Sequence, residues 1–309
     1  MVLQGAKRWR PKPSQVDELH ALLRTDLPSF IESCFHTLLP TVEFKTNWHI
    51  EAIAYQLEQV RRGKIKRLII NLPPRSLKSI ICSVAFPAFI LGHDPSARVI
   101  AVSYGSDLAT KLSNDFRAIL QSPRYREIFP HTVVSRTKNT DSEVTTTRNG
   151  LRIATSVGGT LTGRGGDIVI IDDPLKPQDA LSDSKRQSAN DWFFNTLLSR
   201  IDDKTTGAII LVMQRVHLDD LAGTLMHGSD DWTILNLPAI AEQDERIQIG
   251  EGRYHFRRVG DLLHPEREPM SVLESLRMEL GSDIFAAQYQ QNPAPPGGSM
   301  IKREWVKVL

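Results

Sequence analysis

Cysteines, aromatic residues and long apolar runs are all scarce in this sequence. The two cysteines, Cys34 and Cys82, are not spaced as a metal-binding or redox pair, which excludes a disulfide scaffold and predicts buried free thiols. The longest apolar run, residues 80–91, is interrupted by Ser83 and Pro87 and is shorter than the roughly 20 residues of a membrane span. No apolar stretch follows the basic N-terminus, so no signal peptide is predicted. We therefore expect a soluble intracellular protein without a membrane partner.

The sequence also carries little net charge. Its 38 Lys and Arg residues against 36 Asp and Glu residues give a formal net charge of +2, so any contact with nucleic acid must come from local patches. The nine histidines are scattered without the spacing of a structural metal site. With 309 residues, 40% of them hydrophobic, the chain has the composition and length of a globular protein with a large core.

Four segments of different character follow one another along the chain. Residues 1–45 have helical apolar spacing and predict an N-terminal helical arm. In residues 46–240 short apolar runs alternate with helical stretches, which predicts an α/β fold with a mainly parallel sheet covered on both faces. Residues 241–291 predict a helical C-terminal lid, and the Pro- and Gly-rich residues 292–309 predict a linker towards a further domain.

Apolar runs mark the candidate strands of the sheet. The core strands are expected at residues 67–72, 98–104, 151–155, 167–171, 208–213 and 232–237. Helices are expected at residues 14–23, 29–39, 48–62, 78–91, 106–121, 183–199, 218–226 and 271–290. Residues 132–137 and 143–147, followed by Asn149 and Gly150, predict an antiparallel insertion with a hairpin turn.

Residues 68–79 have the layout of a phosphate-binding loop. An apolar strand leads into a short loop, then Lys78 and Ser79, then an apolar helix, so that backbone N–H groups and the helix start can face an anion. The usual pattern has glycine at two positions that are Leu72 and Leu77 here. If position 77 needs a positive φ, a leucine there costs about 1–2 kcal/mol. The alternative is a strand–turn–helix with a solvated Lys78.

Two adjacent acids end the apolar strand at residues 167–171. In P-loop nucleotide hydrolases the first acid at this place, here Asp172, holds Mg²⁺. The second, Asp173, can orient the attacking water. Two neighbouring carboxylates repel each other unless a cation or donors lie close by, which favours a metal-facing strand end over a simple turn.

Two further segments carry polar groups suited to nucleotide chemistry. Gln214 follows the strand at 208–213 and can reach the γ-phosphate or its water, or else it is a solvated strand end. Arg164 lies in a glycine-rich loop at residues 158–166, where it can act as an arginine finger in a neighbouring subunit, contact DNA phosphate or be solvated. Trp48, about 30 residues before Lys78, can supply an aromatic face for adenine or be a core residue at a helix start.

Four segments in this order resemble the large subunit of the terminase of tailed bacteriophages. They are residues 70–79 (INLPPRSLKS), 162–174 (TGRGGDIVIIDDP), 213–223 (MQRVHLDDLAG) and 285–293 (FAAQYQQNP). The likeness runs from about Trp48 to the C-terminus. It implies a three-layer P-loop NTPase of the additional-strand, RecA-like type, followed in the family by a ribonuclease-H-like nuclease domain for which this chain has no matching residues.

The resemblance implies an ATP-driven motor that moves double-stranded viral DNA into a procapsid. ATP and Mg²⁺ would be the ligands, and DNA, the portal protein, the small terminase subunit and further copies in a ring would be the partners, all in the host cytoplasm. By position, Arg75, Lys78 and Ser79 match the family's phosphate loop. The candidate ATP-binding residues are Pro74, Arg75, Ser76, Leu77, Lys78 and Ser79, with Trp48 as the candidate for the base. Ser79 and Asp172 match the metal site, and the candidate catalytic residues are Asp173, Gln214 and Arg164.

The sequence departs from the family pattern in the same loop and strand ends. Leu77 replaces the usual glycine, Asp173 stands where glutamate is commoner, and Met213 and Gln214 replace a small residue or Thr in many relatives. Two alternatives to the motor therefore stay open. One is a catalytically weak or inactive P-loop scaffold that binds DNA or the portal, and the other is a helicase-like, DNA-dependent ATPase.

Overall fold

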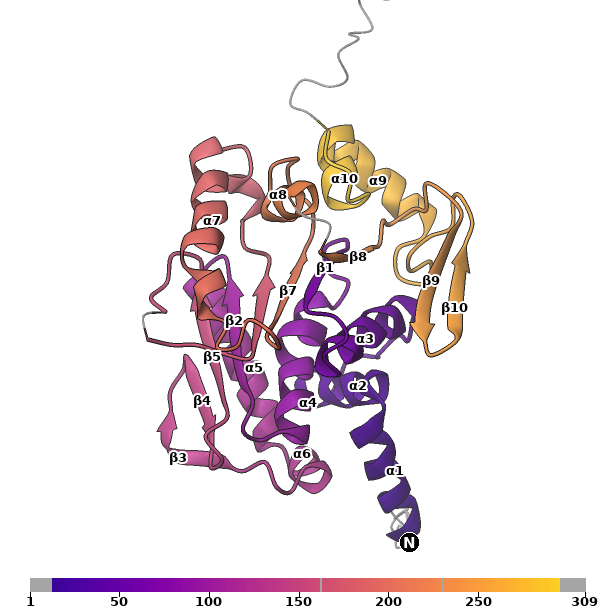
Figure 1. The fold of residues 1–309 in the computed structure, drawn as a ribbon. Helices are drawn as coiled ribbons and strands as arrows, with labels where there is room; N and C mark the ends of the chain where they lie inside the picture. The colour runs from indigo at the N-terminus through magenta and orange to yellow at the C-terminus, as the bar shows by residue number, and fades with distance from the viewer. Residues whose placement is uncertain (1–12, 162, 229–230, 295–309) are drawn as a thin grey trace, which may run out of the picture.

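An eight-stranded sheet forms the centre of the computed structural model, which describes residues 13–161, 163–228 and 231–294 (Figure 1). The strand order is β3-β4-β5-β2-β6-β7-β1-β8. The strands are β1 (Arg67–Asn71), β2 (Arg98–Ser103), β3 (Val134–Asn139), β4 (Glu143–Thr146), β5 (Leu151–Ser156), β6 (Ile168–Asp172), β7 (Ala208–Met213) and β8 (Thr233–Asn236). The six core strands pair in parallel, as the continuous apolar runs predicted.

The order of the central strands gives the fold its type. Strand β7 lies between β1, which leads into the candidate phosphate loop, and β6, which ends in the candidate acid Asp172. This additional strand between the two is the arrangement that the family resemblance implied. In the parallel register Asn71 is opposite Met213 and Asp172 is opposite Val212, so the three strands end at the same edge of the sheet.

Helices cover both faces of the sheet and make three layers (Figure 1). They are α1 (Pro13–Thr25), α2 (Leu27–Leu38), α3 (Trp48–Arg61), a π-helical turn η1 (Ile80–Ala85), α4 (Phe86–His93), α5 (Ser106–Gln121), α6 (Pro123–Ile128), α7 (Asp183–Asn195) and α8 (Leu221–Gly228), with short 3₁₀ turns at Pro177–Asp179 and Leu197–Arg200. Alternate residues of the strands belong to different clusters: Leu68 and Ile70 join the cluster with α2 to α5, whereas Ile69 joins the one with α7 and α8.

The N-terminal helices belong to the same core as the sheet. Leu27, Phe30, Ile31 and Cys34 of α2 are buried in the cluster that contains α3 to α5. Helix α2 begins with Asp26 as its cap, whose carboxylate accepts from the N–H of Ser29. The predicted helical arm therefore exists as helices, but α2 is packed into the core and is not a separate unit.

The antiparallel insertion has the form that the sequence predicted. Strand β3 pairs antiparallel with β4, and β4 pairs antiparallel with β5. Asn149 has a φ of +64° in the turn between β4 and β5, a conformation that asparagine adopts more readily than most residues. These strands extend one edge of the parallel sheet.

The segment after β8 differs from the helical lid expected at residues 241–291. It starts with an antiparallel hairpin, β9 (Glu245–Gly250) and β10 (Arg253–Arg257), and only then forms α9 (Met270–Leu280) and α10 (Ser282–Gln288). A separate small cluster of Ala239, Leu273, Phe285 and Tyr289 holds the two helices. Most of the predicted linker, residues 295–309, lies outside the described residues. No helix in the described part of the chain is long and apolar enough to cross a membrane.

Candidate active site

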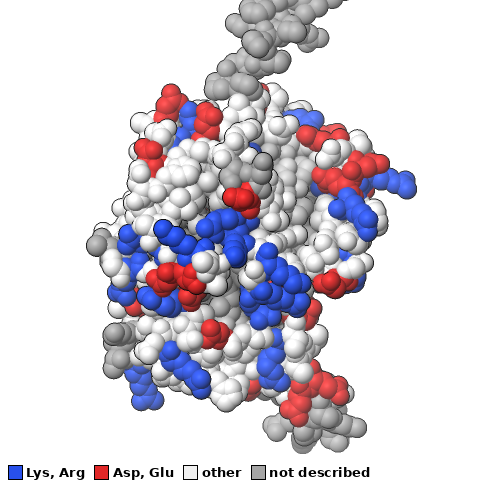
Figure 2. Space-filling model, viewed as in Figure 1, with Lys and Arg blue, Asp and Glu red and all other residues white. Residues whose placement is uncertain are grey.

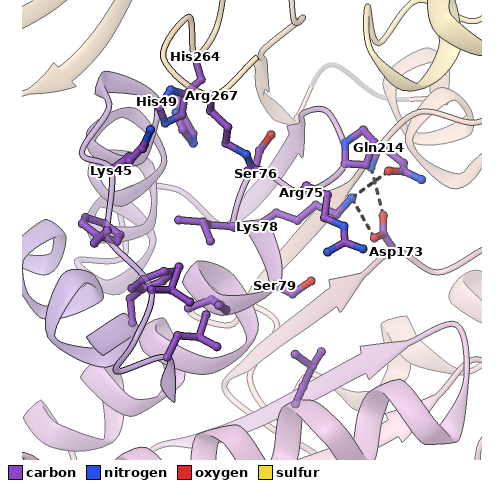
Figure 3. Close-up of a pocket in the computed structure, with 18 of the residues that line it drawn as sticks. Lys45, His49, Arg75, Ser76, Lys78, Ser79, Asp173, Gln214, His264 and Arg267 are labelled. Atoms are coloured by element: carbon purple, nitrogen blue, oxygen red, sulfur yellow. Dashed lines mark hydrogen bonds and ion pairs between the residues drawn. The ribbon is translucent and has the colours of Figure 1, made fainter. Parts of the chain in front are cut away.

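A cavity of about 920 Å³ opens at the edge of the sheet where β1, β6 and β7 end (Figure 3). The residues predicted for the phosphate loop all line it: Pro74, Arg75, Ser76, Leu77, Lys78 and Ser79. Asp173 from the end of β6 and Gln214 from the end of β7 line it as well. The structure thus brings together side chains that are up to 140 residues apart in the sequence, because parallel strands end at one edge.

The loop holds two residues in the left-handed region. Arg75 has a φ of +64° and Leu77 a φ of +62°. This region costs a residue other than glycine about 1–2 kcal/mol. Position 77 therefore has the conformation for which the usual pattern supplies glycine, and the expected strain at Leu77 is present. The Leu77 side chain is half-buried and packs against the core cluster around α2 to α5.

Lys78, Asp173 and Gln214 are in direct contact (Figure 3). Nζ of Lys78 lies 2.9 Å from Oδ2 of Asp173 and 3.4 Å from Oε1 of Gln214. The backbone N–H of Gln214 donates to Oδ1 of Asp173 at 3.1 Å. Lys78 is only 6% exposed, so its ammonium is held inside the site by a carboxylate and an amide oxygen.

Asp172 lies directly behind the cavity and is fully buried. Burial, and next the neighbouring Asp173, raises the pKa of its carboxyl to about 6, while Lys78 and the hydroxyls of Ser83 and Ser79 act to lower it. Its Oδ1 has no hydrogen-bond partner among the described residues. A buried carboxylate oxygen without a partner, next to the Ser79 hydroxyl, fits an Mg²⁺ ion held through water. The described residues contain no group of three acidic, His or Cys side chains that could hold a metal without further ligands.

The segment after Gln214 is fixed by a buried ion pair. Nε of Arg215 lies 2.9 Å and 3.0 Å from the two carboxylate oxygens of Asp220, which is fully buried. Asp220 also accepts from the backbone N–H groups of Val216, His217 and Gly223. The strand end that carries Gln214 therefore has a rigid support, which its sequence position alone did not indicate.

The structure corrects the position expected for Trp48. Its ring does not line the cavity but stacks on His255 of β10, with 4.3 Å between the ring centroids and 7° between the planes. Arg257 lies over the same ring, 5.4 Å from its centroid. The expectation that Trp48 forms an adenine face does not fit this packing, because its partners belong to a hairpin that the sequence analysis did not predict.

Residues that the sequence analysis passed over line the cavity near the loop. They are Lys45, His49, His264 and Arg267, together with apolar side chains of α2 and α5 (Figure 3). His49 is 2% exposed, and burial, followed by the nearby His264, lowers its pKa to about 3. Asn47 donates to Nδ1 of His49 at 2.7 Å, so the neutral ring carries its proton on Nε2. The signal in the sequence was the position of His49 directly after Trp48 at a helix start.

Arg164 is placed away from the cavity of its own chain. Its guanidinium forms a bidentate ion pair with Glu143, at 3.0 Å and 2.8 Å, and 48% of the side chain is exposed. Arg164 is not among the residues that line the cavity. Any role in nucleotide chemistry therefore requires a second subunit or a large movement of the loop.

Positive charge dominates the wall of the cavity. Five cationic side chains line it (Lys45, Arg75, Lys78, Lys111 and Arg267) against two acidic ones (Glu43 and Asp173). Figure 2 shows Lys and Arg side chains gathered near the middle of the face that it draws. The protein as a whole has a formal net charge of only +2, so the positive potential of the cavity comes from local placement.

Comparison with known proteins identifies the fold. No protein-family profile and no curated protein matches the sequence. Among solved structures, the large terminase of bacteriophage HK97 is similar, with a TM-score of 0.54 and 12% identity over 90% of this chain and 55% of that one. A mutant ATPase domain of the Thermus phage P74-26 large terminase gives a TM-score of 0.49 and 16% identity, over 84% and 98% of the two chains.

A third similar structure is the large terminase of a thermophilic bacteriophage in complex with ADP, with a TM-score of 0.42 and 11% identity over 77% and 52% of the two chains. The present chain spans about half the length of the HK97 protein. Over nine-tenths of its own residues, the chain has the fold of a bacteriophage large terminase.

Proposed function

We propose that the chain binds ATP with Mg²⁺ and hydrolyses it as the ATPase part of a viral DNA-packaging motor. The observation that carries the proposal is the meeting of the phosphate loop, Asp173 and Gln214 around one positively lined cavity at the ends of three adjacent strands. Lys78, Asp173 and Gln214 have complementary roles in phosphoryl transfer, as cation, water-orienting base and γ-phosphate contact.

Each residue of the site has a proposed role in ATP binding or hydrolysis that follows from its position. The N–H groups of residues 74–79 and the ammonium of Lys78 would bind the β- and γ-phosphates, in competition with Asp173 for the ammonium. Ser79 and, through water, Asp172 would hold Mg²⁺, which neutralises charge on the phosphate oxygens. Asp173 then orients the attacking water, and Gln214, whose backbone is bonded to Asp173, responds to loss of the γ-phosphate.

His49 replaces Trp48 as the candidate contact for the nucleobase. It lies beside the phosphate loop, its ring is neutral near pH 7 because burial lowers its pKa to about 3, and it has an N–H to donate. Trp48, the preceding residue of α3, lies edge-on to the His49 ring with 6.4 Å between the centroids, and it is itself packed on His255 and Arg257. We propose that purine binding at this end of the cavity uses His49 and not Trp48.

The proposed motor function also involves DNA, partner proteins and further copies of this chain. The fold shared with a large terminase supports double-stranded DNA as the translocated substrate and the portal protein and small subunit as partners. A homo-oligomeric ring in the host cytoplasm would let Arg164 of one subunit complete the site of the next. We also propose residues 46–240 as the ATPase core, with 1–45 and 241–291 attached to it and 292–309 leading to a nuclease domain.

The experiment that tests the proposal is calorimetry of Mg·ATP binding to the wild-type chain and to Lys78→Ala. An ATPase assay with and without double-stranded DNA then follows on the same proteins, with Lys185→Ala, an exposed lysine on α7, as the control. Binding that is lost in Lys78→Ala and kept in the control supports an ATPase, and stimulation by DNA supports the motor.

The absence of binding at millimolar ATP would contradict the proposal. The strained Leu77 and the Lys78–Asp173 contact would then describe a loop closed to phosphate, and the chain would be a scaffold with the fold of an ATPase. If the chain binds and hydrolyses ATP at a rate that double-stranded DNA does not change, the proposed ATPase activity would stand and the proposed motor function would be contradicted.

A further inference from the structure

The helix after the phosphate loop begins as a π-helix. The turn η1 spans Ile80–Ala85, and the N–H of Phe86 donates to the carbonyl of Ile81, five residues earlier. Such turns are rare and frequently occur at functional sites, since the additional residue turns the following side chains to another side of the helix. Ser83 lies in the middle of this turn and is 1% exposed.

The hydroxyl of Ser83 holds one oxygen of Asp172. Its Oγ donates to Oδ2 at 2.8 Å, between two fully enclosed side chains. Oδ1 of the same carboxylate has no hydrogen-bond partner in the described part of the chain. A carboxylate with one oxygen fixed in this way has a defined orientation, and its second oxygen is available to a metal-bound water.

Arg152 of β5 holds Ser83 from the other side. Its Nη2 donates to the backbone carbonyl of Ser83 at 3.0 Å, and its guanidinium lies over the ring of Phe116, 5.0 Å from the centroid. Arg152 is 1% exposed, and its Nε and Nη1 have no hydrogen-bond partner among the residues described. Burying a guanidinium that is incompletely paired costs folding free energy. The nearby Asp172 charge compensates part of this cost, because it acts to raise the pKa of Arg152, which burial lowers to about 10.

We propose that Ser83 is a positioning residue for the magnesium site, presented by the π-helical turn, held by Arg152 and orienting the carboxylate of Asp172. The inference rests on the proposed function, because it concerns the same Mg²⁺ ion. Ser83 lies four residues beyond the phosphate-loop serine, so the loop pattern of the sequence does not include it. The contact is visible only in the folded chain.

The Ser83–Asp172 hydrogen bond could serve only to satisfy a buried carboxylate, or it could orient that carboxylate for a metal, and the two roles predict different effects of removing it. Loss of the first lowers stability and leaves the affinity for metal unchanged. Loss of the second weakens metal binding by about 10–100-fold, as is typical when a hydrogen-bond partner of a ligand is removed. The two are separated by measuring ADP binding with and without the metal.

The experiment compares Ser83→Ala with Ser113→Ala in the whole chain. Ser113 of α5 is also fully buried, but its hydroxyl has no hydrogen-bond partner among the described residues and is not bonded to Asp172, so it controls for loss of a buried hydroxyl. ADP binding is measured by calorimetry in EDTA and at a series of Mg²⁺ concentrations. Thermal unfolding of each variant is recorded alongside, and Ser83→Thr tests whether a hydroxyl at position 83 restores binding.

We expect Ser83→Ala to raise the Mg²⁺ concentration that half-saturates ADP binding by about 10–100-fold, with ADP affinity in EDTA unchanged. Ser113→Ala should match the wild type, and Ser83→Thr should recover most of the loss. An unchanged Mg²⁺ dependence in Ser83→Ala, or an equal loss with and without Mg²⁺, would overturn this inference alone. A wild-type chain that binds no ADP under either condition would overturn the proposed function and the inference together.

Discussion

Lys78 and Asp173 form an ion pair of 2.9 Å across the mouth of the phosphate loop. The other oxygen of Asp173 accepts from the backbone N–H of Gln214 at 3.1 Å, so both carboxylate oxygens have partners. The Lys78 ammonium has three N–H donors, and Asp173 and Gln214 accept from two of them, so a triphosphate in the loop would compete with Asp173 for this charge. Under the proposed function, this competition would weaken the Lys78–Asp173 contact when ATP binds and free the carboxylate to orient water.

Asp173→Asn should separate binding from hydrolysis. The amide is close in size to the carboxylate but cannot accept a proton, so turnover should fall by about 10²–10⁴-fold. Lys78 loses a competing anion, so the affinity for Mg·ATP should be equal to or higher than that of the wild type. Calorimetry and steady-state ATPase rates measure the two effects, and Asp141→Asn, which changes an exposed carboxylate, is the control. Loss of binding in Asp173→Asn would show that the carboxylate has a structural role.

The strain at Leu77 can be measured by comparing the unfolding free energies of its alanine and glycine variants, whose usual order should be reversed at this position. Leu77→Ala and Leu77→Gly both lose the packing of the leucine, but only glycine is free of strain at a φ of +62°. Leu77→Gly should therefore be the more stable of the two by about 1–2 kcal/mol in urea unfolding. At the helical control position Leu19 of α1, the glycine variant should be less stable than the alanine variant by about 1 kcal/mol. The same order at both positions would contradict strain at residue 77.

The strands of the sheet could be predicted because their environment is uniform. Strands such as β7, buried at every position, need continuous apolar runs, and such runs stand out from the chain around them. The same reasoning located Asp172, Asp173 and Gln214, since each follows directly from a strand end. Their convergence then depended only on the parallel order of the strands.

The parts that escaped prediction depend on contacts distant in the sequence. Strands β9 and β10 alternate apolar and polar residues around a Gly-Glu-Gly turn, with Ile247 and Ile249 before it and Tyr254 and Phe256 after it, but the sequence analysis treated the whole polar segment as part of a helical lid. The partner of Trp48 is His255 on this hairpin, and without the hairpin the position of the indole could not be inferred. The π-helical turn at Ser83 likewise depends on packing against β5 and β6 and has no pattern of its own.

His49 should make the stability of the fold depend on pH. Its folded-state pKa of about 3 lies below the unfolded value of 6.5, so between these values the unfolded chain binds the additional proton and stability falls as pH falls. At pH 5 the wild type should have lost about 2 kcal/mol of unfolding free energy through this group. His49→Gln should remove that part of the loss, as measured by urea unfolding at pH 7 and pH 5.

His36→Gln is the control for this pH dependence, because it removes a histidine that is about half-exposed on α2. This variant shows how the loss of an imidazole outside the core changes the pH dependence of the unfolding free energy. If His49→Gln and the wild type lose the same free energy between pH 7 and pH 5, the buried neutral state of His49 is wrong.

Asp220 should be essential for the stability of the strand end that carries Gln214. Asp220→Asn leaves the Arg215 guanidinium buried without its carboxylate and should lower the unfolding free energy by about 3–5 kcal/mol. The adjacent Asp219→Asn is the matched control, since the Asp219 side chain is 77% exposed and should cost no more than about 0.5 kcal/mol. Equal effects of the two substitutions in urea unfolding would show that the buried pair adds no stability.

Arg164 can be tested as a group that acts on a neighbouring subunit by mixing two inactive variants. It does not line the cavity of its own chain, and its pairing with Glu143 leaves it half-exposed. Arg164→Ala keeps an intact Asp173, whereas Asp173→Asn keeps an intact Arg164. In a mixed ring some sites would combine a good carboxylate with a good arginine from the next subunit, so hydrolysis should return to a measurable fraction of the wild-type rate.

The mixing experiment requires that the two variants assemble together, which sedimentation of differently labelled chains establishes. Each variant alone should be slow, because an arginine finger contributes about 10³–10⁵-fold to the rate where it has been measured. Lys185→Ala mixed with Asp173→Asn shows the rate expected from simple dilution of active subunits. A co-assembled mixture of Arg164→Ala and Asp173→Asn that remains as slow as its components would exclude action between subunits, and the ion pair with Glu143 would then be the whole role of Arg164.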